Sequence, residues 1–414
     1  MNVSIKPYFV QFLLFMAFCS ESLAQVRQGI QFINGDFEKI VTFAKVQNKP
    51  IFIEIYLKGC PHCEALEPIL AEQEVGNFYN QNFICWRVEA NSKESQTLQK
   101  EKGITYPEFP FFFFFDKTGS LVHLASPAER PTKVEFMSEV ILHGKTAINP
   151  QLRASNYAHR FQTGERDVMF LVNYGKYCKT MKDTMNLHKI NTVFGKLLIL
   201  PNDIVSPIGF YVIRRLIDDF DNPLAQYFFI HLSQFNGTFE PKEVIEAGET
   251  IIFNSLYGTK PNTIQKIIQM REYMKLMGVP AVDADARTLL KELEAYFWAK
   301  NTKGAVQRFD SYRLTNTKIG IEDYAYLMRY FNEKATDNSY LSFMAHWADS
   351  GLKTITKEQK NSKTEADIYF ELAKAYQKMG KQTEAIANAH TAFEIAKAAK
   401  IELKPYETLK ATLK

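Results

Sequence analysis

The order of apolar and polar positions divides the chain into two parts. Up to about residue 146, short apolar runs alternate with amphipathic stretches, which predicts strands and helices in turn. The strands are expected at Ile51–Leu57, Asn82–Val88, Phe111–Phe115 and Leu121–Ala125. The helices are expected at Phe37–Gln47, from Cys60 past Leu70, at Ser92–Lys102 and at Thr132–Leu142. The first part therefore reads as an α/β domain.

Residues 147–414 read as one helix after another, which predicts an all-α helical array. The clearest helical periods are Ile208–Phe220, Lys242–Leu256, Thr263–Met277, Ala286–Lys300 and Ile321–Asn332. Lys196–Leu200 is a single weak candidate for a strand in this part.

One segment of the helical part, residues 366–400, has a more specific pattern. Small residues, among them Ala373, Ala385 and Ala389, alternate with large ones such as Tyr369, and Gly380 lies at the expected turn. This order resembles a tetratricopeptide (TPR) repeat, in which small residues let two antiparallel helices pack closely. The alternative is a generic helical hairpin.

Composition adds the class of protein and excludes one kind of partner. The chain has 414 residues, of which 46% are hydrophobic and 23% are charged, as in soluble globular proteins. The formal net charge is only +4, and no basic block stands out. Because a phosphate-binding surface needs concentrated Lys and Arg, nucleic acid is not expected as a partner.

The first 24 residues have the pattern of a secretory signal peptide. Lys6 precedes an apolar run from Tyr8 to Phe18, and Ser22 and Ala24 place small residues before a cleavage site. The run is too short to cross a bilayer, and no stable membrane insertion is expected. The alternatives are a buried N-terminal element, or a lipid anchor at Cys19, which Phe18 disfavours. We expect a periplasmic or secreted protein.

The motif Cys60-Pro61-His62-Cys63 carries the candidate chemistry. Structural zinc usually needs four ligands, and there is neither a second CxxC motif nor a histidine pair at finger spacing, so we expect no metal and no cofactor. The motif follows an apolar strand and opens a helix, so Cys60 lies where free backbone N–H groups stabilise a thiolate. Cys60 is then the attacking cysteine, and Cys63, one turn later, closes the disulfide.

His62 can add positive charge beside that thiolate, which makes the disulfide more oxidising; the alternative is an ordinary surface residue. Cys85 is expected to be a buried inert thiol in a strand. A bridge between Cys85 and Cys178 is the other arrangement that an oxidising compartment allows.

The residues around this motif resemble the thioredoxin superfamily, and we assign residues 25–146 to a thioredoxin-like domain. Cys63 to Leu70 is similar to the family's active-site helix, including Pro68, and Gly103 to Pro110 is similar to the segment that leads to its cis-proline. The resemblance implies that Pro110 is cis and faces the cysteines. Pro107 is the competing candidate.

Glu54 lies where thioredoxins carry a buried acid that handles the proton of the second cysteine. The resemblance implies the same role here, unless Glu54 is an exposed strand residue. The motif is closer to that of periplasmic disulfide-forming oxidases, but only 46 residues separate Cys63 from Pro110, too few for the helical insertion of those enzymes. Gly59 is a second departure, because thioredoxins usually carry Trp there.

The sequence thus predicts an exported thiol–disulfide oxidoreductase. An oxidase or isomerase is favoured over a reductase, but the direction of electron flow stays open. Its expected partners are proteins with thiols or disulfides and a redox partner protein, and its helical region is expected to bind partners or clients. The alternative is a helical-repeat interaction scaffold in which the thioredoxin-like domain is a binding module with a minor redox role.

Overall fold

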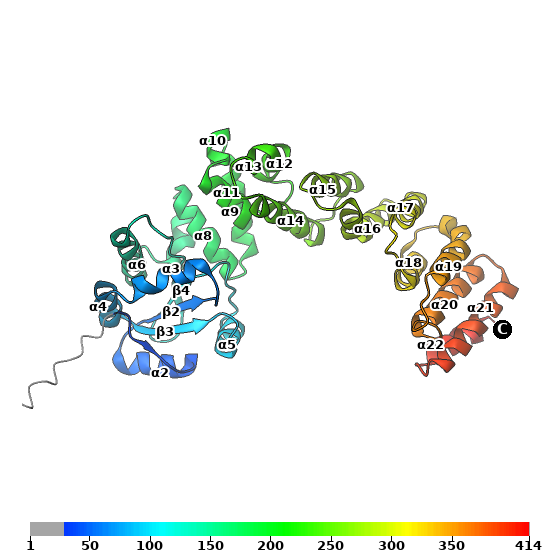
Figure 1. Cartoon of the computed structure of the whole chain (residues 1–414), viewed down its shortest axis with the longest axis horizontal. Helices are drawn as coiled ribbons and strands as arrows, with labels where there is room; N and C mark the ends of the chain where they lie inside the picture. The colour runs from blue at the N-terminus through cyan, green and yellow to red at the C-terminus, as the bar shows by residue number, and fades with distance from the viewer. Residues whose placement is uncertain (1–28, 414) are drawn as a thin grey trace, which may run out of the picture. The chain divides into compact units, whose positions relative to one another are not determined.

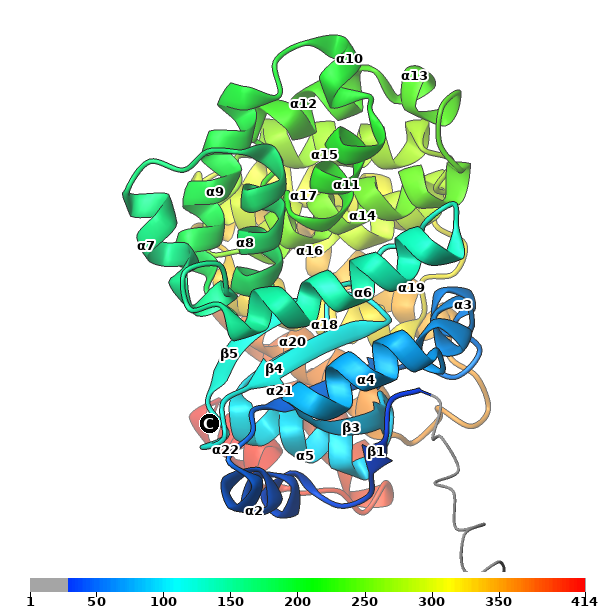
Figure 2. The same ribbon diagram turned by 90° about the vertical axis from the view of Figure 1, so that its left-hand side faces the viewer.

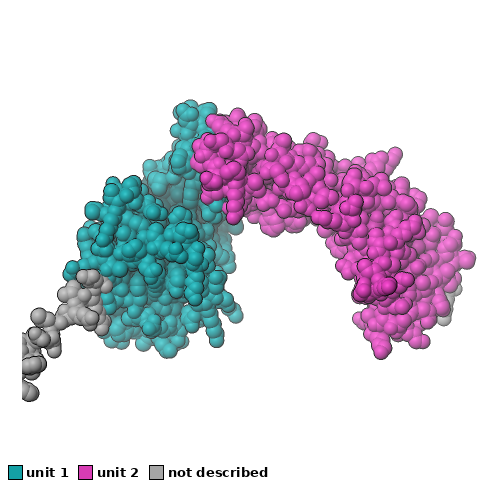
Figure 3. All heavy atoms as spheres, in the orientation of Figure 1, with its two compact units in different colours: residues 1–216 teal, residues 217–414 magenta. Residues whose placement is uncertain are grey.

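The computed structural model describes residues 29–413. The predicted signal peptide and Cys19 lie outside these residues. The chain divides into two compact units, residues 1–216 and 217–414, which Figure 3 shows in different colours. Each unit is described by itself. Within residues 29–413, no helix is both long and apolar enough to cross a membrane.

The first unit contains a five-stranded sheet with the order β1-β3-β2-β4-β5 (Figure 1). β1 and β2 are both parallel to β3, whereas β4 runs antiparallel to β2 and to β5. The five strands are β1 (Phe32–Ile33), β2 (Ile51–Tyr56), β3 (Ile84–Glu89), β4 (Phe111–Phe115) and β5 (Leu121–Ala125). The predicted strands are therefore present, and the apolar β2 and β4 lie side by side in the interior of the sheet.

Helices cover both faces of this sheet. They are α2 (Phe37–Gln47), α3 (Pro61–Leu70), α4 (Gln73–Asn82), α5 (Lys93–Lys102) and α6 (Lys133–Ile148). α3, α4 and α6 contact one another and lie in front of the strands in Figure 2. Their core includes Leu66, Tyr79 and Phe136 against Phe52 and Phe114 of the sheet. The thioredoxin-like α/β fold that the sequence predicts is confirmed.

The expectation of a single helix continuing past Leu70 was wrong. α3 ends at Leu70, Glu72 is extended, and α4 begins at Gln73. The chain breaks here because the Leu70 carbonyl accepts a hydrogen bond from the Ile30 N–H at 2.9 Å. Gly76 packs directly against the backbone of Gly29, where a side chain would collide.

The first unit continues beyond α6 with further helices. They are α7 (Tyr157–Gln162), α8 (Val168–Thr180), α9 (Thr184–Leu197), α10 (Pro201–Ile204) and α11 (Pro207–Arg215), and a 3₁₀ turn, η1 (Ala154–Asn156), precedes α7. The strand expected at Lys196–Leu200 is absent, because α9 runs to Leu197. Ile190 and Phe194 are buried four residues apart on one face of α9, which is the period of a helix rather than of a strand. α11 ends at Arg215, five residues earlier than expected.

The second unit is helical throughout its described residues. Its helices are α12 (Pro223–Ile230), α13 (Leu232–Asn236), α14 (Pro241–Tyr257), α15 (Ile264–Leu276), α16 (Ala281–Trp298), α17 (Thr302–Thr315), α18 (Ile321–Lys334), α19 (Met344–Lys353), α20 (Lys363–Lys378), α21 (Gln382–Ala398) and α22 (Lys404–Thr412), and the 3₁₀ helix η2 (Asn338–Phe343) precedes α19. The all-helical region that the sequence predicts is confirmed.

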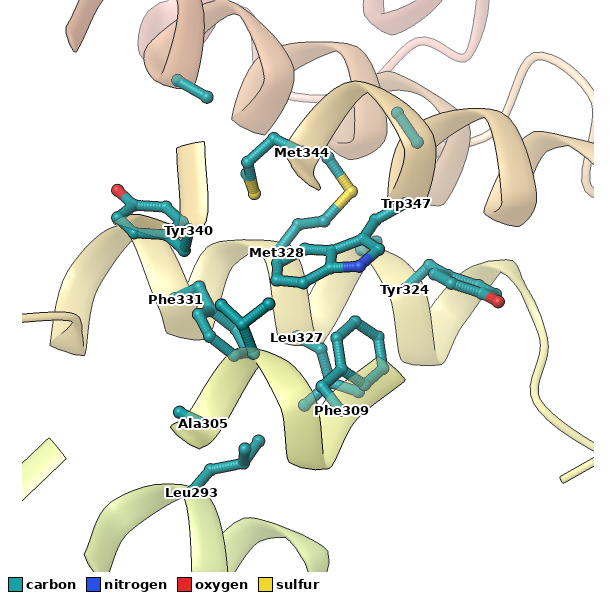
Figure 4. Packing of buried hydrophobic residues seen from close by; sticks show 14 of the residues in the cluster. Leu293, Ala305, Phe309, Tyr324, Leu327, Met328, Phe331, Tyr340, Met344 and Trp347 are labelled. Atoms are coloured by element: carbon teal, nitrogen blue, oxygen red, sulfur yellow. The ribbon is translucent and has the colours of Figure 1, made fainter. Parts of the chain in front are cut away.

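One hydrophobic cluster extends from α16 to α20 of the second unit (Figure 4). Trp347 of α19 is fully buried at its centre, with its ring centroid 4.9 Å from that of Phe309 and 4.8 Å from that of Phe331. Its indole N–H donates to Oδ1 of Asp310 at 2.9 Å. One aromatic side chain therefore joins α17, α18 and α19.

α20 and α21 form the helical hairpin expected at residues 366–400. Gly380 turns the chain with φ of 71°, a conformation that favours glycine. Ala373 of α20 and Ala385 and Ala389 of α21 are buried between the helices. The hairpin fits both the TPR-like and the generic interpretation, so the assignment to a TPR repeat stays a prediction.

We expect Trp347→Ala to destabilise the second unit by about 3–5 kcal/mol, because it removes a fully buried indole and leaves a cavity. Trp298, which is 61% exposed at the end of α16, provides a matched control, and Trp298→Ala should change stability by less than about 0.5 kcal/mol. Hydrogen exchange of peptides from α17, α18 and α19 measures the effect. Equal protection in the two variants would contradict the central role of Trp347.

Candidate redox site

Strand β2 and the turn after it place the cysteine motif at the C-terminal end of a central strand. Ile51 to Ile55 are buried between β3 and β4, and the chain then turns at Lys58 and Gly59. Gly59 has φ of 74°, in the left-handed region that residues with a side chain rarely adopt. A Trp at this position would be strained in this conformation, a constraint that the sequence pattern did not reveal.

Cys60 is the N-cap residue of α3 and is partly exposed. Its carbonyl accepts hydrogen bonds from the N–H groups of Cys63 and Glu64 at 3.0 and 3.1 Å. Pro61 occupies the first helical turn, where its missing N–H costs no hydrogen bond. The Cys60 sulfur therefore lies at the positive end of the helix dipole, at a partly exposed position.

Cys63 lies one turn further along α3, is buried, and faces the sheet. Burial, followed by the hydrogen bond with Cys60, raises the pKa of the Cys63 thiol to about 12. The charge of Glu54 raises it further, so these two groups interact. Cys63 therefore stays protonated at neutral pH and needs a base before it can act as a nucleophile. Both cysteines of the pair are free thiols in this structure.

Glu54 is at the centre of β2 and is 0% exposed, as expected of an inward-facing acid. Its neighbours across the sheet are Arg87 on β3 and Phe112 on β4. Burial raises the pKa of Glu54 from 4.5 to about 7, although the Arg87 charge opposes the rise. A carboxyl group whose pKa is raised towards neutral pH is suited to take up and release a proton.

The peptide bond between Phe109 and Pro110 is cis, which agrees with the choice of Pro110 over Pro107. The carbonyl oxygen of Phe109 lies 3.8 Å from the Cys60 sulfur. The structure thus brings Cys60, Cys63, Glu54 and the cis-proline segment together at one end of the sheet.

His62 is exposed on α3, with 73% of its side chain accessible. Its Nδ1 lies 3.8 Å from Oε2 of Glu129, a residue of the segment between β5 and α6. His62 therefore faces an acidic side chain at the surface beside the cysteine pair. Glu129 was not singled out in the sequence, because its approach to His62 depends on how this segment folds back.

A second set of contacts fixes the segment before Pro110. Nζ of Lys176 on α8 lies 2.7 Å from Glu108, and the Tyr211 hydroxyl of α11 donates to Glu108 at 3.1 Å. Burial favours the neutral acid, but the charge of Lys176, together with hydrogen bonds from Lys176, Ser126 and Tyr211, holds the pKa of Glu108 below its ordinary value. The Thr105 N–H donates to the Thr180 carbonyl at 2.9 Å. These partners are far away in the sequence, and no pattern identified them.

The remaining cysteines are separate from this site. Cys85 is a buried free thiol in β3, as expected, and Cys178 is a buried free thiol in α8. The two are not bridged in this structure. Within residues 29–413, no group of three or more His, Cys, Asp or Glu side chains is arranged to hold a metal ion.

Comparison with known proteins finds a family match within the first domain. Residues 32–117 match a family model described as thioredoxin-like. No curated protein matches the chain. The domain resembles three solved structures at low identity. A putative disulphide-isomerase from Bacteroides thetaiotaomicron is 22% identical, with a TM-score of 0.25, and the match covers 29% of this chain and 96% of that one.

The other two solved structures are a thioredoxin from Thermus thermophilus and a disulphide isomerase from Xylella fastidiosa. The thioredoxin is 13% identical, with a TM-score of 0.22 over 30% of this chain and 91% of its own. The isomerase is 14% identical, with a TM-score of 0.20 over 33% of this chain and 98% of its own. The family match over residues 32–117 and the helices that follow it show a thioredoxin-like domain followed by a helical region.

We expect Glu54→Gln to remove a pH-dependent loss of stability. Because folding raises the pKa of Glu54 from 4.5 to about 7, the unfolded chain releases this proton at lower pH than the folded chain. The free energy of unfolding of the wild type should therefore decrease by up to about 3 kcal/mol as the pH rises from 4.5 to about 7. In Glu54→Gln this decrease should be absent.

Hydrogen exchange of peptides from β2 and β3 during urea titrations at pH 4.5 and pH 8 measures this difference. Glu64→Gln, which alters an exposed carboxylate of α3, serves as the control. Equal pH dependence of stability in wild type and Glu54→Gln would contradict the prediction.

Proposed function

We propose that the protein is an exported thiol–disulfide oxidoreductase that acts on protein thiols and disulfides through Cys60 and Cys63. The observation that carries the proposal is the arrangement of the pair. Cys60 is accessible at the start of α3 beside the Phe109 carbonyl, and Cys63 is buried behind it, near a carboxyl group that can take its proton.

Reduction of a client disulfide proceeds in two exchanges. The Cys60 thiolate attacks one client sulfur, the client S–S bond breaks, and the other client sulfur leaves as a thiolate. Cys63 then gives its proton to the Glu54 carboxylate and attacks the Cys60 sulfur. The mixed disulfide breaks, the second client thiolate leaves, and the Cys60–Cys63 disulfide forms. The client gains two electrons and the cysteine pair loses two.

The same steps in reverse oxidise a client dithiol, and a redox partner protein then restores the disulfide of the pair. We favour this oxidase direction, or isomerisation, over reduction. The helix N-terminus stabilises the Cys60 thiolate, and a cationic His62 would add to this effect. Stabilising the reduced form makes the disulfide a stronger oxidant.

The helical region is proposed to bind the client or the redox partner. Its second unit has a cavity of about 330 Å³ between α18, α20 and the start of α22. Aromatic side chains, Tyr326, Phe370 and Tyr406, line it together with charged residues. The same cavity favours the alternative, in which binding is the main task and the thioredoxin-like domain has a minor redox role.

The reduction potential of the Cys60–Cys63 pair separates these functions. For an oxidase or isomerase we expect a potential between about −180 and −120 mV, whereas a value near about −270 mV would assign a reductase. A redox titration of the full chain, read by alkylation and mass spectrometry, measures it. Cys85→Ser combined with Cys178→Ser should leave the titration unchanged, and Cys63→Ser should abolish it. A pair that never interconverts between dithiol and disulfide would leave only the binding alternative.

Export is proposed from the pattern of residues 1–24 alone. Cleavage after Ala24 should give a mature protein that begins at Gln25, because small residues precede that bond. Fractionation of the producing cells, followed by N-terminal sequencing, measures this. A chain that keeps Met1 and stays in the cytoplasm would contradict export without affecting the proposed redox chemistry.

A further inference from the structure

The guanidinium group of Arg87 lies between two carboxylates that differ in burial. Its Nε is 3.0 Å from Oε2 of Glu54, which is fully buried in β2. Its Nη1 is 3.0 Å from Oε1 of Glu67 on α3, a side chain that is 62% exposed. Arg87 thus connects the inside of the sheet with the outer surface of the active-site helix.

These two contacts are not equivalent. The contact with Glu67 is an aligned hydrogen bond in which Nη1 donates to Oε1. Neither carboxylate oxygen of Glu54 has an aligned donor, and Nε of Arg87 has no aligned acceptor. The guanidinium carbon also lies 4.4 Å from the centre of the Tyr56 ring. Glu67 and Tyr56 therefore orient the guanidinium by direct contacts, whereas Glu54 attracts it strongly through its charge but without an aligned hydrogen bond.

We propose that Glu67 is a positioning residue. It holds Arg87 so that the guanidinium cannot form a bidentate ion pair with Glu54. Glu54 thereby stays able to take up and return a proton. This inference rests on the proposed function, in which Glu54 accepts the proton of Cys63. A bidentate ion pair with arginine would stabilise the Glu54 carboxylate, and a carboxylate stabilised in this way is a weak base.

The groups around Glu54 come from three neighbouring elements. From β3 the charged neighbour is Arg87, from α3 they are Glu67 and Cys63, and from β4 the neighbour is the apolar Phe112. The charge of Glu67 itself raises the pKa of Glu54, in the same direction as burial. Loss of Glu67 would therefore act twice, because it removes a like charge and releases the guanidinium.

The test is the titration of Glu54 in the reduced, full-length protein. Infrared spectra of protein with ¹³C-labelled glutamate, with Glu54→Gln as the assignment spectrum, follow protonation of this one carboxyl group. In Glu67→Gln we expect the titration midpoint to move to lower pH by about 1 pH unit. Glu64→Gln removes the same charge from the same helix, one turn earlier, and should leave the midpoint in place.

The Arg87→Gln background separates positioning from simple charge. If Glu67 acts by holding Arg87, Glu67→Gln in this background should move the midpoint by less than about a third of its effect in wild type. An equal movement with and without Arg87 would overturn the inference, and so would an unchanged midpoint in Glu67→Gln.

A second measurement separates this inference from the proposed function. The rate at which Cys63 closes the mixed disulfide should follow the Glu54 midpoint, so the lower limb of its pH profile should shift with Glu67→Gln. If the midpoint moves as expected and the closing rate does not respond, the positioning by Glu67 stands and the proposed role of Glu54 as base fails.

Discussion

A carboxyl group at the centre of an apolar sheet is the constraint on which the first domain depends. Glu54 belongs to a strand whose neighbours include the five phenylalanines of β4, so water cannot solvate its charge. Such a group must be neutral or must lie close to a cation, and Arg87 supplies that cation from the adjacent strand. The register of β2 and β3 therefore serves the chemistry as well as the fold, because it alone places these two residues opposite each other.

The main elements of this domain were predictable because each has a strong local signal. Apolar runs marked β2, β4 and β5, and in the structure the side chains of Asp36 and Ser92 cap α2 and α5. The break between α3 and α4 was missed because it depends on the N-terminal segment, which bonds to the Leu70 carbonyl from 40 positions earlier in the chain. A helical period cannot reveal a contact of that kind.

The candidate site was predictable to a similar extent. Cys60, Cys63, Glu54 and Pro110 were found because motif spacing and the family resemblance identify them. The contact between Arg87 and Glu67 was not predicted. It depends on the register of β3 against β2 and on which face of α3 is turned towards β3, and neither can be read from the sequence. In the helical region, periodicity located helices but not their partners. Glu292 is buried and pairs with Arg271 and Arg308 from the neighbouring helices. Its burial was not predicted, because a glutamate in a helix is usually exposed.

The contacts of Glu108 limit where the chain can be cut to build domain chimeras. A cut at the end of α6 would separate a largely buried carboxylate from Lys176 and Tyr211 and remove the carbonyl that Thr105 bonds. The smallest transferable cassette is therefore larger than the five-stranded fold and extends to Leu216. Chimeras that exchange the helices of the second unit should be joined after that residue, so that the loop carrying the cis-proline keeps its native support.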